Sequence, residues 1–183
     1  FNSLFEEVAA SLEVEPITPG PMPTPEPTSE PSPTPLATLV PGSFSDLTSG
    51  FTLDIPSGWS MLDSGKGMTV KFINQDGVIL QVFTTAIPSD MTAEVYSLAL
   101  QEARYQLLSG YQLVSDTETT AGALTAEELQ FTATTGIGHS DQAYLVVVVK
   151  QGSQAHVLEA IGAPIVFGQH EEEIRKLIDS FTP

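Results

Sequence analysis

The chain of 183 residues carries 23 acidic and only six basic side chains, a formal net charge of −17, and it contains no cysteine. So strong a negative charge repels phosphate backbones and anionic lipid surfaces, which argues against nucleic acid as a partner. The lack of cysteine excludes a disulfide framework, a thiolate zinc site and a cysteine nucleophile. No stretch approaches the ~20 apolar residues that cross a bilayer, and the length suits one domain plus an extension.

Residues 1–15 form a short acidic segment with an apolar stripe. Apolar side chains recur there at helical spacing: Phe1, Leu4, Phe5, Val8, Ala9 and Leu12. Ser3 and Glu6 form the S-x-x-E pattern of a helix-capping box. A helix this short is marginal in water, so it needs a surface to pack on. Two interpretations stay open, a docking helix and the frayed end of a lost transmembrane segment. The candidate partner-binding residues of the docking helix are Phe1, Leu4, Phe5, Val8 and Leu12.

Residues 16–43 form a spacer rich in proline, threonine and serine. Ten of the 14 prolines lie in residues 16–41. Proline removes a backbone donor and favours extended conformations in the residue before it. The tract is therefore expected to be a semi-rigid polyproline II spacer, with a reach of roughly 80 Å at ~3.1 Å per residue. We expect it to hold a folded domain of residues 44–183 away from whatever the N-terminal segment binds.

The chain begins at Phe1, without a methionine. We therefore expect a signal peptide or a membrane anchor upstream, and any membrane contact only through an anchor missing from this chain. Spacers of this composition resemble O-glycosylated stalks between a surface anchor and an exported domain. The expected location is extracellular or on the surface of the cell envelope.

The first half of residues 44–183 is predicted to hold strands and one helix. Strands are expected at 44–47, 51–55, 69–73 and 78–87, with turns at Pro56–Gly58, Ser64–Gly67 and Asn74–Gly77. Thr92 is placed to cap a helix that runs to about Ser109 and ends at Gly110. Its predicted apolar face consists of Val95, Leu98, Ala99 and Leu107, with Tyr105 beside it.

The second half of this domain is predicted to hold four more strands and a second helix. Strands are expected at 111–119, 123–134, 142–150 and 154–162, and a last helix at 167–181. The run from Tyr144 to Val149 is continuously apolar, which predicts a central strand covered on both faces. The core face of the last helix is predicted to be Ile174, Leu177, Ile178 and Phe181. The fold class is therefore α+β, an antiparallel sheet flanked by helices and preceded by the proline-rich linker.

The segment from Gly50 to Trp59, GFTLDIPSGW, resembles the start of PsbP-like domains. These domains share an α/β/α sandwich with the photosystem II extrinsic protein and with bacterial lipoproteins of the LpqN type. The resemblance covers residues 44–183 and implies a non-catalytic role, in docking onto a membrane complex or in the cell envelope. Pro56, Gly58 and Trp59 are expected to be structural, because the turn lets Trp59 cover an open end of the sheet.

Two departures limit what the resemblance implies. The photosynthetic members engage their complex through N-terminal segments and basic residues, whereas this chain has no basic residue before Lys66. An oxygen-evolution role is therefore not carried over. The lipobox cysteine of the lipoproteins is absent from this chain as well.

No motif here predicts catalysis. His139 with Asp141 fits a glycine-rich hairpin better than a metal or catalytic pair, because metal sites need three or four converging ligands. His170 with the following Glu171–Glu173 could bind a divalent cation, but acids that open a helix are explained by the helix dipole. His156 is expected to be an ordinary half-buried side chain. The sequence predicts no enzyme activity, no cofactor and no metal.

The sequence thus predicts a non-catalytic, exported protein-interaction domain, tethered by the spacer to a membrane or a partner complex. Its partner would be another protein, or a second copy bound through the N-terminal segment. One alternative is a structural subunit of an extracellular filament or of the periphery of a membrane complex. Another is a small envelope hydrolase or a ligand carrier.

Overall fold

The computed structural model describes residues 42–63, 69–135 and 140–183. The N-terminal segment, residues 16–41 of the spacer, the turn at Ser64–Gly67 and His139 lie outside the described residues. In the described part the elements follow the predicted order of strands, helix, strands and helix. The strands are β1 (Gly42–Asp46), β2 (Phe51–Ile55), β3 (Trp59–Asp63), β4 (Thr69–Asn74), β5 (Ile79–Ala86), β6 (Ser109–Ala121), β7 (Leu124–Thr135), β8 (Ser140–Gln151) and β9 (Gln154–Gly162). The helices are α2 (Ala93–Leu100), the π-helical turn η1 (Gln101–Tyr105) and α3 (Pro164–Asp179).

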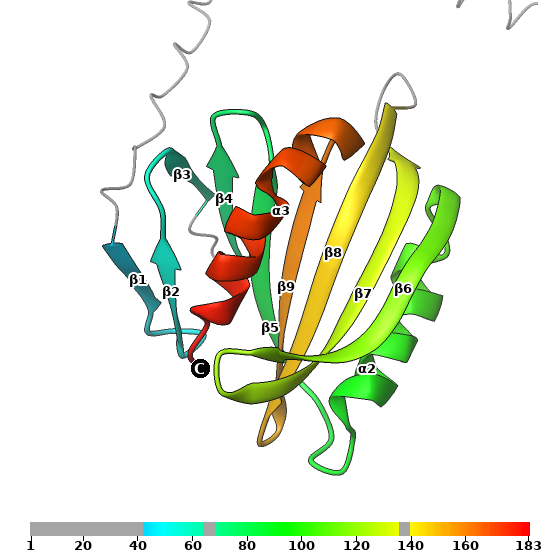
Figure 1. Cartoon of the computed structure of the whole chain (residues 1–183). Coiled ribbons are helices and arrows are strands. Elements are labelled where there is room, and N and C mark those ends of the chain that lie inside the picture. The colour runs from blue at the N-terminus through cyan, green and yellow to red at the C-terminus, as the bar shows by residue number, and fades with distance from the viewer. Residues whose placement is uncertain (1–41, 64–68, 136–139) are drawn as a thin grey trace, which may run out of the picture. The chain divides into compact units, whose positions relative to one another are not determined.

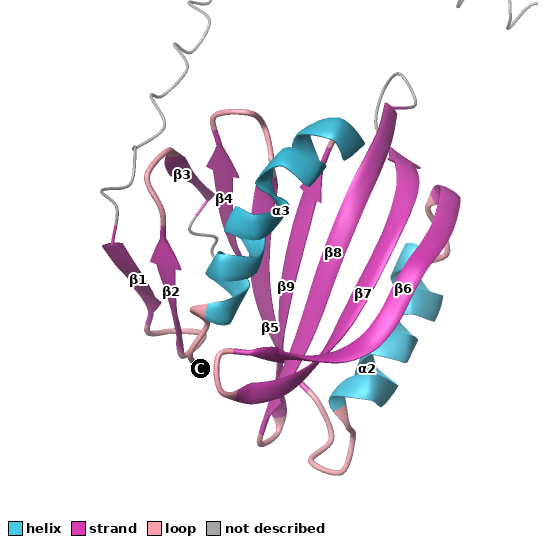
Figure 2. Ribbon diagram, in the orientation of Figure 1, coloured by secondary structure: helices cyan, strands magenta, loops and turns pink. Residues whose placement is uncertain are grey.

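Seven strands form one sheet, and every neighbouring pair is antiparallel. The order across the sheet is β3-β4-β5-β9-β8-β7-β6. β1 and β2 form a separate two-stranded hairpin, so the strands predicted at 44–47 and 51–55 lie outside the main sheet. The hairpin and α3 lie on one face of the sheet, whereas α2 lies on the other (Figures 1 and 2). This is the α+β sandwich that the sequence predicts.

The sheet separates two apolar layers. The larger layer lies between the sheet and α3, and it includes Trp59, Phe72, Leu145 and the buried side of α3. The smaller layer lies under α2 and includes Tyr105, Phe131 and Tyr144. Residues Tyr144 to Val149 of β8 are all buried and alternate between the two layers, so the prediction of a strand covered on both faces is confirmed.

The predicted apolar face of the first helix is wrong. Val95, Leu98, Ala99 and Leu107 are all exposed. The buried residues of this region are Ser97, Gln101 and Tyr105. Small Ser97 lets the helix lie close to the sheet, and the aromatic ring of Tyr105 packs on Phe131 at a centroid distance of 4.9 Å. The packing of large rings therefore decides which face of the helix is buried.

The bounds of both helices also differ from the predicted ones. Thr92 caps α2 as expected, because its Oγ1 accepts a hydrogen bond from the amide of Val95. The α-helix ends at Leu100, and the next turn is π-helical, with the amide of Gln106 donating to the carbonyl of Gln101 over 2.9 Å. α3 begins three residues earlier than predicted, at Pro164, because proline suits the first helical position. Phe181 lies beyond its end but stays buried.

Candidate functional site

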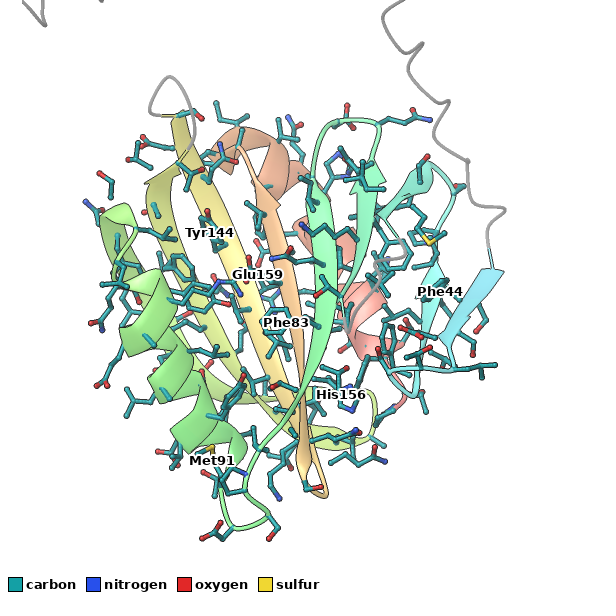
Figure 3. All side chains as sticks on the ribbon, turned by 180° about the vertical axis from the view of Figure 1, so that it is seen from behind. Phe44, Phe83, Met91, Tyr144, His156 and Glu159 are labelled. Carbon is teal, nitrogen blue, oxygen red and sulfur yellow. The ribbon has the colours of Figure 1, made fainter. Side chains whose placement is uncertain are left out.

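The face of the sheet that carries α2 is only partly covered. α2 packs on β7 and β8, and no described helix covers β4 and β5 from this side (Figure 3). An open groove of about 500 Å³ lies there between the sheet and α2. Its lining residues are Thr69, Lys71, Gln81, Phe83, Thr84, Thr85, Tyr96 and Arg104. The groove is thus built from two strands, the first turn of α2 and the π-helical turn η1.

A row of polar side chains crosses this face of the sheet. Lys71 of β4 pairs in register with Gln81 of β5, and Gln81 pairs with Glu159 of β9. Glu159 is only 1% exposed, although its strand is otherwise mostly apolar. A buried carboxylate needs hydrogen-bond donors to offset its lost hydration. Gln81 supplies one, since its Nε2 donates to Oε1 of Glu159 over 2.7 Å.

The π-helical turn η1 brings two more donors to Glu159. The hydroxyl of Tyr105 donates to Oε2 over 2.7 Å, and Nη2 of Arg104 lies 3.3 Å from the same oxygen. A π-turn is uncommon and recurs at functional sites, because the extra residue changes which side chains face inward. Here two consecutive residues, Arg104 and Tyr105, both reach the same buried carboxylate.

Arg104 lies at the boundary between the buried network and the groove. Its guanidinium carbon is 5.3 Å from the ring centroid of Phe83 and 5.2 Å from that of Tyr105, within the range of cation–π attraction. The side chain is nevertheless 45% exposed. One edge of the guanidinium therefore neutralises Glu159 while the rest of the group faces the groove.

The electrostatics favour binding over proton transfer at this place. Burial raises the pKa of Tyr105 far above its ordinary value, and the neighbouring charge of Glu159 and their hydrogen bond raise it further. The phenol therefore stays protonated and remains a donor. Three side chains donate to the carboxylate of Glu159, so this group is engaged within the protein and is not presented as a base.

A second polar cluster lies beside the turn at Gly58. Trp59 is fully buried, and its Nε1 donates to Oε1 of Glu173 over 3.2 Å. His170 lies between two carboxylates, with Nδ1 2.9 Å from Oε2 of Glu173 and Nε2 2.9 Å from Oδ2 of Asp76. Its hydrogen bond to Glu173, joined by the one to Asp76, raises the pKa of His170 despite partial desolvation. The cluster ties α3 to the β4–β5 turn and to the start of β3.

The interpretation of Glu171–Glu173 as acids that open a helix is wrong. α3 begins at Pro164, so these residues lie in its middle, away from the N-terminal dipole. Each instead has a basic partner: Glu171 pairs with Arg175, Glu172 with Lys176, and Glu173 with His170. In the described residues no group of three or more His, Asp or Glu side chains is arranged to hold a metal ion.

The structure places the other residues singled out in the sequence as follows. Gly58 has φ +89°, a conformation that glycine adopts without strain, so the turn from Pro56 into Trp59 depends on it. Asp141 accepts a hydrogen bond from Thr134 across the β7–β8 pair.

The prediction that His156 is half-buried is wrong, because its side chain has no exposed surface. It lies beneath the ring of Phe181, and burial lowers its pKa. The candidate partner-binding residues Phe1 to Leu12 lie outside the described residues.

Sequence reasoning missed the residues around the groove. Gln81, the consecutive pair Arg104 and Tyr105, and Glu159 are far apart in the chain; the register of β5 and β9 and the position of η1 bring them together. One signal was present: Glu159 lies in a mostly apolar strand, next to Leu158 and Ala160. A charged residue at a covered position of a central strand indicates a buried network.

The domain resembles three solved structures along most of its length. Cyanobacterial PsbP (CyanoP) from Synechocystis sp. PCC 6803 has 16% sequence identity and a TM-score of 0.57, over 80% of this chain and 95% of that chain. LpqN, described as involved in cell envelope biogenesis of Mycobacterium tuberculosis, has 19% identity and a TM-score of 0.56, over 73% of this chain and 84% of the other. The domain has the PsbP-like fold.

A third structure with this fold is a Pseudomonas aeruginosa protein of unknown function, described as a putative regulator. It has 14% identity and a TM-score of 0.55, over 77% of this chain and 95% of the other. No protein-family model matches the sequence, and no curated protein matches it. At such identities the comparison establishes the PsbP-like fold, which confirms the expectation drawn from the segment Gly50–Trp59. None of the helices in the described ranges has the length and apolar character needed to span a bilayer.

Proposed function

We propose that the chain is a non-catalytic, exported interaction domain, which residues 1–43 attach to a protein partner or to a membrane complex. The observation that supports this function best is the unequal cover of the sheet. α3 and the β1–β2 hairpin cover one face, whereas on the other face the groove over β4 and β5 stays open beside α2. An open groove with aromatic and charged side chains suits recognition of a partner.

The polar groups of both clusters also favour binding over catalysis. The carboxylate of Glu159 accepts hydrogen bonds from three side chains, and His170 is held between Asp76 and Glu173. A catalytic acid or base has to face a substrate with a free position. These groups instead join elements of the domain to one another. The solved relatives CyanoP and LpqN, the second described as acting in cell envelope biogenesis, are consistent with an accessory role outside the cytoplasm.

Photo-crosslinking tests the attachment through the N-terminal segment. A photo-reactive amino acid replaces Phe5 in the full chain, and a second sample carries it at exposed Asp90 in the loop before α2. In cells that make the full-length protein, we expect the residue 5 probe to crosslink one defined protein and the residue 90 probe not to. Crosslinking of the residue 5 probe only within its own chain, or equal products at both positions, would contradict the proposal.

Self-assembly is the second candidate function. Leu113 and Val114 are exposed apolar residues on β6, an edge strand of the sheet, and such edges promote association between chains. Light scattering distinguishes this candidate: residues 1–183 and residues 42–183 should both form oligomers at micromolar concentration, because both contain the edge strand β6. If the full chain is monomeric throughout, self-assembly is excluded and a different protein is the partner.

A further inference from the structure

The guanidinium of Arg104 has more hydrogen-bonding capacity than the buried network uses. Within the described residues its hydrogen bonds go to Glu159 alone, through Nη2. A guanidinium carries five N–H donors in a planar fork that matches the two oxygens of a carboxylate. The remaining donors, on Nη1 and Nε, belong to a side chain that is 45% exposed in a groove of about 500 Å³.

The surroundings of Arg104 hold it in one orientation. From behind, the buried carboxylate of Glu159 holds Nη2, and Tyr105 and Gln81 in turn hold that carboxylate. The rings of Phe83 and Tyr105 flank the guanidinium at 5.3 and 5.2 Å. An arginine fixed in this way loses little conformational entropy when it binds an anion, which favours affinity.

The groove also provides an apolar contact next to the guanidinium. The ring of Phe83 is partly exposed on the floor of the groove, and Tyr96 of α2 forms the adjacent wall. Lys71 adds a positive charge to the lining of the groove, but Arg104 is the group that Glu159 and the two rings hold in place. Arg104 is therefore the group on which anion binding depends.

We propose that this groove binds a carboxylate, with Arg104 as its anchor and Phe83 beneath the apolar part of the ligand. The carboxylate belongs either to a free organic acid or to an acidic side chain of a protein. The proposal rests on the proposed function, in which the same groove recognises a partner, and it adds the chemical class of the ligand; it does not concern the attachment of the N-terminal segment. Arg104 and Lys71 are two of the six basic residues of the chain, and both line this groove.

Titrations followed by NMR of the full, isotope-labelled chain test the proposal. The first pair of probes is phenylacetate and its neutral analogue phenylacetamide. The second pair is the blocked dipeptide Glu-Phe and its neutral analogue Gln-Phe. We expect at least one acid to shift the backbone amides of β4 and β5 and the Nε–H of Arg104. Its neutral analogue should bind about tenfold more weakly or worse, because a charged hydrogen bond is lost. Binding of phenylacetate indicates a free organic acid as the ligand, and binding of Glu-Phe indicates an acidic side chain of a protein.

Variants with a matched control connect the binding to Arg104. Arg104→Met should abolish the shifts, whereas Arg175→Met, at a second arginine that pairs with a glutamate of the sheet, should preserve them. If Arg104→Met does not fold, Arg104→Lys keeps a charge beside Glu159 but loses the planar fork, and it should weaken binding about tenfold. Equal binding of an acid and its amide, unchanged binding by the folded Arg104 variant, or no shift with either acid would overturn the proposal. None of these results bears on the photo-crosslinking test, so the two proposals fail separately.

Discussion

The hydroxyl of Tyr105 donates a hydrogen bond of 2.7 Å to the buried carboxylate of Glu159, 54 residues further along the chain. This contact joins the π-helical turn after α2 to β9, the central strand of the sheet. It is the shortest link between the smaller helix and the polar row beneath the groove. The stability of the domain and the shape of the groove therefore depend on the same pair.

We predict that Tyr105→Phe destabilises the domain by about 1–3 kcal/mol, because the change leaves a buried carboxylate short of one donor. Urea unfolding measures the difference. Tyr111→Phe is the matched control, since the hydroxyl of Tyr111 accepts a hydrogen bond from Gln101 in a less buried setting. The control should lose less than half as much stability. Equal losses of unfolding free energy in the two variants would show that the hydrogen bond to Glu159 contributes no more than the one between Gln101 and Tyr111.

We predict a clear difference between two neighbouring cations of α3. Arg175 pairs with Glu128, whose side chain is 9% exposed, whereas Lys176 pairs with exposed Glu172. Arg175→Met should cost about 1–3 kcal/mol, because it leaves a mostly buried carboxylate without its partner. Lys176→Met should leave the unfolding free energy unchanged, since solvent screens surface pairs. Urea unfolding of both variants decides the matter, and a larger loss for Lys176→Met would refute the ranking.

The cluster around His170 predicts a pH effect on stability. The hydrogen bonds to Glu173 and Asp76 raise the pKa of His170, so the folded state binds the proton more tightly than the unfolded state. The stabilisation is then complete below the unfolded pKa of about 6.5 and is lost as the pH rises through the higher folded pKa. Its size should stay below about 1 kcal/mol, because the carboxylate of Asp76 is largely exposed.

Unfolding measured between pH 5 and pH 9 checks this expectation. Wild-type protein should lose stability relative to His170→Gln across the neutral range, as the pH rises. Burial lowers the pKa of His156, so this residue acts in the opposite direction and reduces stability only as the pH falls below about 6.5. A constant difference between wild type and His170→Gln over the whole range would rule out titration of His170 as the cause.

Two hairpin glycines predict unequal costs for the same substitution. Gly122 (φ +58°) and Gly152 (φ +59°) have the same left-handed conformation. A Cβ at Gly122 would lie 2.5 Å from the carbonyl oxygen of Phe181, whereas one at Gly152 would meet nothing within 4 Å. Gly152→Ala should therefore cost only the conformational strain, about 1–2 kcal/mol, and Gly122→Ala clearly more. Thermal unfolding measures the loss of stability in both variants. Equal melting temperatures would show that the backbone at Phe181 moves away from the added Cβ without loss of stability.

Much of the fold was predictable because its signals are local. The alternation in Phe51–Ile55, the apolar run from Tyr144 to Val149 and the cap at Thr92 each determine structure within a few residues. The segment Gly50–Trp59 also indicated the PsbP-like fold. Each of these features is a short pattern of neighbouring residues, so it can be recognised in the sequence without knowledge of the fold.

The candidate site was not predictable in the same way. Val95 and Leu98 suggested a buried helix face, but the helix instead buries Ser97 and Gln101 and changes to a π-turn before Tyr105. That change depends on the fit of Tyr105 between Phe131 and Glu159, which lie on different strands. The groove likewise exists only because β4, β5 and β9 are neighbours in a particular register. No local pattern carries this information.

The most direct measurement compares the unfolding free energies of residues 1–183 and 42–183 in urea. If the N-terminal residues serve for attachment, they add nothing to the core of the domain, and the two values should agree within about 0.5 kcal/mol. A loss of more than about 2 kcal/mol in the shorter chain would mean that the removed residues pack against the domain and stabilise it. That result would contradict the account of a self-sufficient domain with a separate N-terminal attachment.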